Sequence, residues 1–350
     1  RRLLAPCMAL LLGLAAVGTA SAVTLADQPV FASSDVPGNL ALALSVEYPT
    51  AISVANLGDY ADASEYLGYF DPRKCYTYQA NTAAPAQGYF QPAGAATGTY
   101  SHSCSGKWSG NFMNWATMQT IDPFRWALTG GYRSVDAVGN TVLEKAWGSA
   151  QGSQSNFPLR GTSAGSGHKL ASGLIASVTP FSWSAFNMSI WKRGNRLVFS
   201  GTNSAYSDTS KNGADWVGTT TQNDAGSVYQ VYVRVKVCDP STGTGGVEAN
   251  CVKYGSNYKP EGLMQQYASK IRYSAFSYLY TSDGNTQGGV MRAAMGFIGP
   301  TYPQPLSTTV VTNPKAEWDP TTGVMTANPD STLDSTVTNS GAMNYLNKFG

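Results

Sequence analysis

The oxygens best placed to hold a cation follow an apolar stretch near the N-terminus. Asn39–Val46 is nearly all apolar, with turn residues before it and Pro49 after it. We expect a strand that is buried on both faces, as in a parallel sheet, and such sheets often carry a ligand where their strands end. At that end the sequence offers Ser45 and Glu47, so the pattern raises the question of a metal site.

Two further motifs have part of the pattern of a chemical site. Gly161–Gly165 has the sequence G-T-S-A-G, and a nucleophile in such a motif needs a strand before it and a helix after it. The flanking residues predict a loop instead. Asp283, Asn285 and Gln287 have the spacing of a calcium loop, but Ala294 stands where a bidentate carboxylate is required. We therefore interpret the second motif as a turn.

The other polar residues give little sign of catalysis. The two histidines, His102 and His168, are not part of a metal-type cluster, and no pair of carboxylates stands out as an acid and a base. We therefore expect a protein that is not an enzyme. Charged residues make up 13% of the 350 residues and the formal net charge is +2, which excludes a strong electrostatic case for binding nucleic acid.

The first 22 residues have the pattern of a secretory signal peptide. Arg1-Arg2 is positive, Leu3–Gly18 is apolar, and the small residues of Thr19–Ala22 predict cleavage after Ala22. A membrane anchor is the alternative, but the apolar run is short and no stop-transfer charges follow it. We expect an exported protein that has no stable membrane insertion after cleavage.

Four cysteines remain after the signal peptide, namely Cys75, Cys104, Cys238 and Cys251. An even number in an exported protein predicts two disulfides. Proximity in the sequence favours Cys75 with Cys104 and Cys238 with Cys251, and two other pairings stay open. A metal site is the alternative, but the sequence has no C-x-x-C pair.

The middle of the chain predicts two short helices. Phe112, Trp115 and Met118 recur at helical spacing, and we interpret this aromatic stripe as core rather than as a ligand platform. A second helix, Phe124–Leu128, should end at Gly130-Gly131. The preceding residues, 57–105, are typical of a loop-rich segment.

The second half predicts strands followed by one long helix. FNMSIW and RLVFSG flank a turn and predict a hairpin, and SVYQVYVRVKVCDP alternates as one long, half-buried antiparallel strand. Pro260 should open a helix that runs to about residue 280, with Leu263, Tyr267 and Ile271 on its apolar face. VMRAAMGFIGP then predicts another strand.

Several blocks of sequence, taken together and in this order, resemble the PilY/PilC family of type IV pilus-associated proteins in its N-terminal region. They are WSGNFMNWATMQTIDPFRWALTGGYRSVD, VCDP with NCVKYGSNYKPEGLMQQYASKIRYSAF, GGVMRAAMGFIGP, and NPKAEWDPTTGV with NSGAMNYLNKFG. The resemblance implies an exported protein that acts at the pilus tip with minor pilins, primes pilus assembly and contributes to adhesion. It also implies a C-terminal β-propeller with a calcium loop, which is not in this sequence.

The resemblance further implies a fold. The N-terminal half of many members resembles a von Willebrand factor A domain, so we expect an α/β chain with a von Willebrand factor A-like, Rossmann-type sheet domain over residues 23–300. A large β-rich insertion is expected around residues 130–258. Residues 301–350 should be an irregular linker or the start of a further segment, because the last residues look like an element that continues beyond Gly350.

A von Willebrand factor A domain ends its first strand with D-x-S-x-S, whose oxygens hold a divalent cation. By pattern, Ser45 stands at the Asp position, Glu47 at the first Ser position and Pro49 at the second. Pro49 supplies no hydroxyl, so we expect that the metal site has been lost and that this segment holds no cofactor. If an ion binds, Ser45 and Glu47 are the first candidate ligands. The alternative role for Glu47 is to accept hydrogen bonds from backbone amides at the strand end.

These observations predict a type IV pilus assembly and tip adhesin protein that docks with minor pilins and promotes surface attachment. The alternative is a metal-dependent extracellular adhesin that grips a host or matrix ligand. A third hypothesis, a secreted enzyme acting on glycans, would need two carboxylates about 5–10 Å apart in a cleft.

Overall fold

The structure is a computed structural model of the 350-residue chain. It describes residues 36–44, 50, 53–147, 157–190, 195–200, 228–278, 289–304, 307, 309–333 and 339–349. Residues 37–350 form one compact unit, which is described here by itself. The expected signal peptide, residues 1–22, lies outside the described residues. No helix within the described ranges is both long and apolar enough to cross a bilayer.

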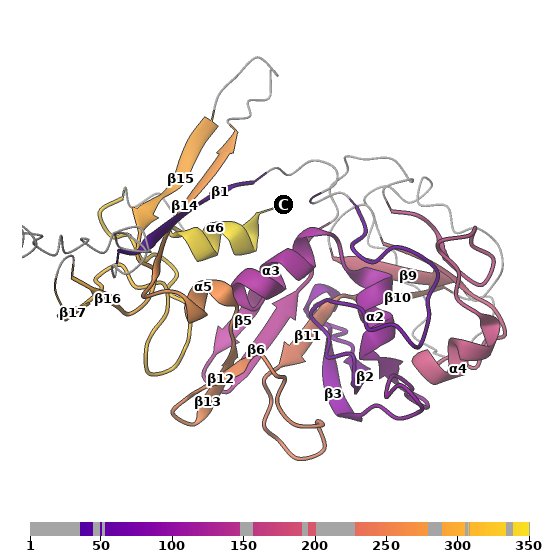
Figure 1. The fold of residues 1–350 in the computed structure, drawn as a ribbon. Helices are drawn as coiled ribbons and strands as arrows, with labels where there is room; N and C mark the ends of the chain where they lie inside the picture. The colour runs from indigo at the N-terminus through magenta and orange to yellow at the C-terminus, as the bar shows by residue number, and fades with distance from the viewer. Residues whose placement is uncertain are drawn as a thin grey trace, which may run out of the picture. The chain divides into compact units, whose positions relative to one another are not determined.

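A three-stranded mixed sheet lies at one part of this unit (Figure 1). Its central strand, β14 (Ile271–Tyr278), pairs in parallel with β1 (Gly38–Ala43) and antiparallel with β15 (Gly289–Gly296). Because parallel strands need a long crossover between them, the whole chain from β1 to β14 is one excursion from this sheet. The arrangement is mixed α/β, and a complete von Willebrand factor A-like sheet stays a prediction.

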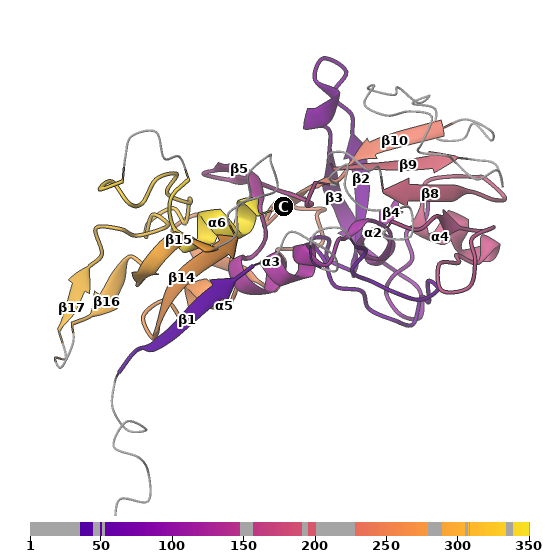
Figure 2. The ribbon, with the colours of Figure 1, turned by 90° about the horizontal axis from the view of Figure 1, so that it is seen from above.

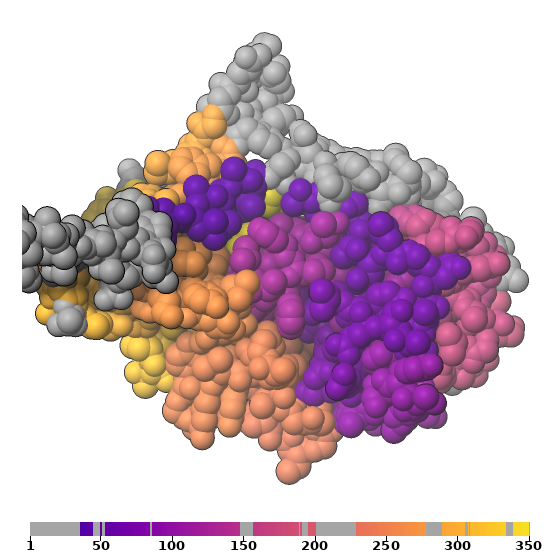
Figure 3. Space-filling view, viewed as in Figure 1, coloured from indigo at the N-terminus to yellow at the C-terminus, as the bar shows by residue number. Residues whose placement is uncertain are grey.

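The first strand is less buried than the sequence predicts. Among the described residues β1 is an edge strand, and Figure 3 shows its atoms at the surface beside those of its sheet. Leu42 is buried in the core, whereas Leu40 is 38% exposed and Ala41 and Ala43 are exposed. The run looks wholly apolar because alanine is apolar but small, and here alanines occupy the face that the described elements leave open. The expectation of burial on both faces is therefore wrong.

Two larger sheets fill the excursion (Figure 2). The six-stranded sheet contains, in spatial order, β4 (Trp108–Ser109), β2 (Lys74–Gln79), β3 (Tyr89–Ala95), β11 (Arg234–Val237), β6 (Asn140–Glu144) and β5 (Arg133–Ala137). The four-stranded antiparallel sheet contains β10 (Val228–Tyr232), β9 (Arg196–Ser200), β8 (Asn187–Ile190) and β7 (Arg160–Gly161). The predicted hairpin is present as β8 and β9. We call the described residues between 53 and 260 the β-rich region.

Two segments of the β-rich region differ from the secondary structure that the sequence predicts. Residues 57–105, expected to be loop-rich, supply β2 and β3 to the six-stranded sheet. The long alternating strand is two strands, β10 and β11, which belong to different sheets. Arg234 is responsible for part of the error, because its charged side chain is buried and forms an ion pair with Glu144 at 3.2 Å. The alternating pattern predicts that Arg234 faces solvent, whereas the structure shows it buried.

Short helices connect these sheets. They are η1 (Pro85–Gln87), α2 (Gly110–Thr117), α3 (Ile121–Thr129), η2 (Ser172–Leu174) and α4 (Ile175–Val178). The side chain of Ser109 caps α2 by accepting the backbone N–H of Phe112. α3 ends at Gly130, whose φ of 80° is left-handed and whose missing Cβ leaves room for the carbonyl of Pro260. Both predicted helices are confirmed, and Phe112, Trp115 and Met118 are fully buried core.

The long helix predicted after Pro260 is wrong. Only α5 (Leu263–Gln266) is helical, and the backbone enters β14 at Ile271. Ile271, Tyr273 and Phe276 are β-branched or aromatic, and hydrogen-bonded neighbours on both sides of β14 stabilise the extended form. Tertiary pairing therefore overrides the helical spacing of the apolar residues.

The remaining described elements are two hairpins and a helix. β12 (Cys251–Tyr254) pairs with β13 (Asn257–Pro260) at the end of the β-rich region. β16 (Thr301–Pro303) pairs with β17 (Val310–Thr312), and α6 (Ala342–Lys348) follows them, within residues 301–350. In Figures 1 and 2, α6 lies against β14 and β15. Its Met343 and Leu346 are buried with Leu42 and Tyr273 in a small core. We call β1 together with the described residues from 261 to 349 the small-sheet region.

Candidate functional site

Two disulfides anchor the β-rich region. The structure joins Cys75 to Cys104 and Cys238 to Cys251, with sequence separations of 29 and 13 residues. These are the pairs that proximity in the sequence favours. Cys75 lies on β2, and Cys238 directly follows β11, so each disulfide fixes a loop to the six-stranded sheet.

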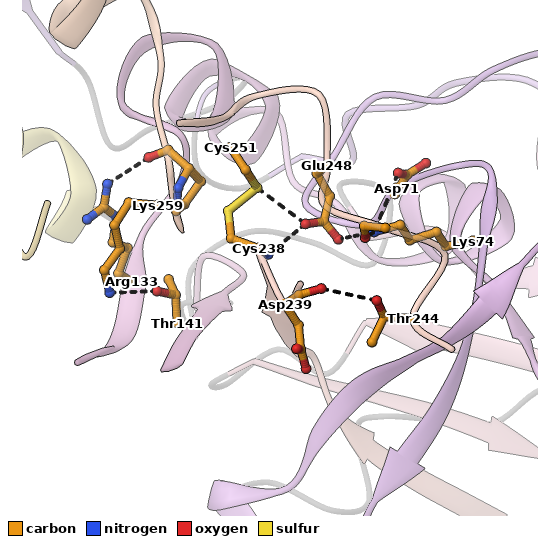
Figure 4. Close-up of a disulfide and its surroundings, with 12 residues drawn as sticks. Asp71, Lys74, Arg133, Thr141, Cys238, Asp239, Thr244, Glu248, Cys251 and Lys259 are labelled. Carbon is orange, nitrogen blue, oxygen red and sulfur yellow. Dashed lines mark hydrogen bonds and ion pairs between the residues drawn. A yellow bond between two sulfur atoms is a disulfide. The ribbon is translucent and has the colours of Figure 1, made fainter. Parts of the chain in front are cut away.

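A buried ion pair links the two disulfide loops (Figure 4). Lys74, the neighbour of Cys75, places its Nζ 2.8 Å from Oε1 of Glu248, and both side chains are less than a tenth exposed. The ammonium also donates to the carbonyl of Gly246 and lies 4.0 Å from Asp71. Glu248 belongs to the loop that the disulfide of Cys238 closes, so the pair joins the two cross-linked segments. Because both side chains are buried, removing either one would leave the charge of the other uncompensated, which would destabilise the fold.

The carboxylate of Glu248 also supports the second disulfide. Its Oε2 accepts the backbone N–H of Cys238 at 2.6 Å and lies 3.3 Å from Sγ of Cys251. Figure 4 shows the carboxylate between the disulfide and Lys74. Within the part of the chain that is described, the possible ligand atoms of Cys238, Glu248 and Cys251 are close enough together to hold a metal ion. With the sulfurs bonded to each other they offer no thiolate, so the donor set does not suit zinc.

A second polar cluster connects the β-rich region to the small-sheet region. Asp136, on β5, accepts Arg133 at 3.2 Å and Lys259 at 2.5 Å. Arg133 also donates to the carbonyl of Pro260 at 2.6 Å, and the backbone N–H of Met325 donates to Asp136 at 2.8 Å. Burial lowers the pKa of Lys259, and Asp136 opposes that effect by stabilising the charged form. The cluster therefore holds three separate segments on one carboxylate.

α3 fixes the end of α6 by a similar device. The guanidinium of Arg125 donates from Nε to the carbonyl of Leu346 at 3.1 Å and from Nη2 to the carbonyl of Phe349. Thr129 donates its hydroxyl to Asn347 at 2.5 Å. The carbonyl of Leu346 also accepts the backbone N–H of Phe349, so Arg125 adds a second donor at the C-terminal end of α6. These contacts join α3 to the end of α6.

The residues proposed for a metal site cannot be placed. Ser45 and Glu47 lie outside the described residues, as do Asp283, Asn285 and Gln287. The last described residue before the first pair, Leu44, packs with Ala146 and Phe349. The carboxyl end of β1 is therefore next to α6 and to the residues that follow β6.

The G-x-S-x-G motif is in a turn, as the sequence predicts. Gly161 ends β7, and the hydroxyl of Ser163 lies 2.9 Å from Oδ1 of Asn187 on the neighbouring strand. His102 is a buried core residue whose Nδ1 lies 2.6 Å from the carbonyl of Asp62. His102 and Ser163 therefore contact different segments of the chain, His102 the backbone of Asp62 and Ser163 the side chain of Asn187.

A groove of about 550 Å³ runs beside β15. Its lining includes residues 291–298, Leu333 and Tyr345 of α6. Met291 and Met295 are 55% and 42% exposed. Exposed apolar side chains next to a groove are typical of a binding surface.

Sequence reasoning missed the buried charges. Lys74 and Glu248 carried a usable signal, because charged residues are scarce in this chain and these two lie within three residues of a cysteine. Arg125 and Asp136 carried no such signal for their contacts with Leu346 and Lys259, which are more than a hundred residues away in the sequence.

Comparison with known proteins gives the chain a family. Residues 58–214 match the family described as "PilY1 homolog, small alpha/beta domain". A "Type IV pilus biogenesis factor PilY1 homolog" of Xylella fastidiosa (strain Temecula1 / ATCC 700964) is 42% identical over 353 aligned residues, covering 93% of this chain. A second protein of that name from the same strain is 28% identical over 265 residues, covering 69% of the chain.

The alignments cover 27% and 17% of those two relatives, so the chain spans about a quarter or less of their length. No solved structure matches it. The order of the sequence blocks, the matched α/β domain and the identity along nearly the whole chain agree with one another. The chain belongs to the PilY1-like family.

Proposed function

We propose that this chain is a binding segment of an exported type IV pilus biogenesis factor. The observation that carries the proposal is the 42% identity to a protein of that name over 93% of the chain. The two disulfides support export, because disulfides persist in oxidising compartments. The segment acts by docking at the pilus tip with minor pilins and not by catalysis, and it contributes to surface attachment.

The small-sheet region is the better candidate for the docking surface. The large aromatic side chains of the β-rich region, which the sequence offers as contact residues, are mostly buried in its core. The groove beside β15 has exposed methionines, whose flexible side chains adapt to a partner's apolar surface. We assign this groove to an apolar surface of a minor pilin, because the identity to a pilus biogenesis factor extends over nearly the whole chain.

The test is complementation of a strain that lacks the gene for the whole protein. The double substitution Met291→Ser with Met295→Ser should reduce the number of surface pili and the capture of purified minor pilins. Val138→Ser is the matched control, since Val138 is 62% exposed in the turn between β5 and β6, away from the groove. Normal piliation and normal pilin capture by the double variant would remove the groove from the proposal. Normal pilus assembly in the deletion strain would remove the function itself.

We further propose that this segment works without a bound metal. The positive side chains of Lys145 and Arg125 are close to the residues that pack at the carboxyl end of β1, and they oppose a divalent cation there. Elemental analysis of the purified chain, and attachment assays with and without EDTA, test this. A stoichiometric divalent ion together with attachment that EDTA abolishes would favour the metal-dependent adhesin instead.

A further inference from the structure

A pocket of about 260 Å³ lies where α3, α6 and the residues after β6 meet. Its lining combines three cationic side chains with aromatic and polar ones, namely Arg125, Tyr132, Lys145, Ala146, Trp147, Asn347 and Lys348. We call it the basic pocket. Leu44, at the carboxyl end of β1, packs against the apolar cluster that contains Ala146 of the pocket lining, so the pocket is near the end of a parallel strand, where α/β sheets commonly bind ligands.

The positive charge of this pocket is not balanced by its lining. None of the described residues that line it carries a carboxylate. Two carboxylates border the lining residues. Asp122 accepts the backbone N–H groups of Gln119 and Ala146 and lies 4.0 Å from Arg125. Glu144 pairs with Arg234 at 3.2 Å and accepts the indole N–H of Trp147 at 2.5 Å. With Arg234 included, four cationic side chains face these two carboxylates, so the pocket keeps an excess of positive charge.

Two of the three cationic side chains are buried, and each has an N–H group that is available to a ligand in the pocket. Lys145 and Arg125 are each 1% exposed. Lys145 donates to the side chain of Gln119 and to the carbonyl of Ala146, which uses two of its three N–H groups. Nη1 of Arg125 lies 4.0 Å from the carboxylate of Asp122, which is too long for a hydrogen bond. Burial lowers the pKa of Lys145 to about 8, and the charges of Asp122 and Glu144 oppose that effect only in part.

We propose that the basic pocket binds the carboxylate of an acidic side chain that a protein partner presents. Arginine and lysine are the usual donors to such a group. Trp147 is 58% exposed at the pocket and offers an aromatic surface to the rest of a peptide. A nucleic acid would need a longer basic surface than this chain, with 13% charged residues and a net charge of +2, provides. The inference rests on this pocket alone and does not require the partner to be a pilin.

The binding test uses the whole chain and a peptide of alternating glutamate and glycine, followed by tryptophan fluorescence. The matched probe replaces every glutamate by glutamine. The glutamate peptide should bind at least about tenfold more tightly, with a fluorescence change that Trp147→Phe loses. Equal binding of the two peptides would overturn the proposal. An acidic segment of the chain itself that occupies the pocket would give no response to either peptide, and that outcome would overturn it too.

Variants locate the binding. Lys348→Gln removes an exposed rim charge and should weaken the glutamate peptide about two- to fivefold, while Lys253→Gln, at an exposed position on β12, should not. Lys145→Met should weaken it more than tenfold. If Lys145→Met does not fold, Lys348→Gln and Trp147→Phe still decide the result. Equal effects of Lys348→Gln and Lys253→Gln would overturn the assignment, as would displacement of the peptide by inorganic phosphate at lower concentration than by acetate.

Discussion

The β-rich region and the small-sheet region are built on different kinds of core. The β-rich core is a continuous set of aromatic rings, in which Trp108 lies 5.1–6.1 Å from four others, those of Phe90, Phe181, Phe199 and Tyr229. Six of the eleven buried residues in the core of the small-sheet region are alanines or methionines, and only Tyr273 and Trp318 are aromatic. Large rings remove more apolar surface from water than alanines do, so the first core should contribute more to stability.

The two regions also differ in how they are cross-linked. Both disulfides and the buried pair of Lys74 and Glu248 belong to the β-rich region. Polar contacts centred on Arg125 and Asp136 attach it to the small-sheet region. We therefore expect the β-rich region to be the more rigid of the two and the small-sheet region to be the more adaptable. The predictions below test that contrast.

The largest effect should come from the aromatic core. Trp108→Ala should lower the free energy of unfolding by about 4 kcal/mol, because it removes a fully buried ring and leaves a cavity. Met343→Ala, equally buried in the smaller core, should lower it by about 3 kcal/mol. Urea unfolding of both variants measures the two values. A loss below 1 kcal/mol for Trp108→Ala would contradict the proposed role of the ring cluster.

Removing one disulfide should have the next largest effect. Replacing Cys238 and Cys251 with serine should cost about 3 kcal/mol, since a 13-residue separation gives a loop whose closure restricts the unfolded chain. Thermal unfolding followed by near-UV circular dichroism should show the loss in aromatic signals. A variant in which Lys74→Met accompanies Glu248→Gln is the companion experiment. It removes the ion pair but keeps the disulfide, so it separates the two contributions.

Glu317 should make the small-sheet region sensitive to pH. Its carboxylate accepts the backbone N–H groups of Ala342 and Met343 at 2.8 Å, and burial raises its pKa to about 7. A carboxyl group whose pKa is raised on folding binds its proton more tightly in the folded state. Its contribution to stability is therefore fully present below about pH 4.5 and is lost as the pH rises through about 7. The loss should be about 2–3 kcal/mol.

The unfolding free energy of the unmodified chain and of Glu317→Gln, measured from pH 4 to pH 8, checks this. The difference between the two profiles should change sharply between pH 4.5 and 7. Asp319→Asn is the control, because backbone hydrogen bonds lower the pKa of that exposed carboxyl. Its effect should therefore appear at pH values below 4. A pH-independent difference for Glu317→Gln would be evidence against a raised pKa.

The smallest effect on stability should come from the groove. Met291→Ser with Met295→Ser should change the unfolding free energy by less than about 0.5 kcal/mol for each substitution, since both side chains are largely exposed. Differential scanning calorimetry measures it. A large loss of stability would mean that the methionines are needed for packing, and the piliation test would then not report on docking.

Local patterns predicted those elements whose neighbours in space are also neighbours in sequence. The helices at Phe112 and Phe124, the hairpin of β8 and β9, and the strand β15 all depend on short-range spacing. β14 was taken for a helix because its stabilising partners, β1 and β15, could not be identified from its own residues. Long-range pairing decides such cases, and single-sequence periodicity does not contain it.

The candidate sites show the same limit. The cysteine pairs could be ranked from spacing, whereas the cations of the basic pocket come from positions 125, 145 and 348 and form no motif. Charged residues that only the fold brings together have no regular spacing in the sequence, so the sequence does not reveal that they form one site. Asn111 and Asn114 illustrate an intermediate case. Their separation of three residues places both on one side of α2. Only the structure shows that their side chains accept the backbone N–H groups of Tyr66 and Phe70.

The parallel pairing of β1 with β14 determines how the chain would respond to tension. Six residue pairs from Gly38 with Ile271 to Ala43 with Phe276 are in register. A pull on residue 37 toward the N-terminus and on β14 toward its C-terminus would load these pairs in shear, all at once rather than one after another. The force would pass directly from β1 to β14. The intervening residues, 44–270, would therefore carry no tension. Tension along the chain would therefore leave the β-rich region relaxed.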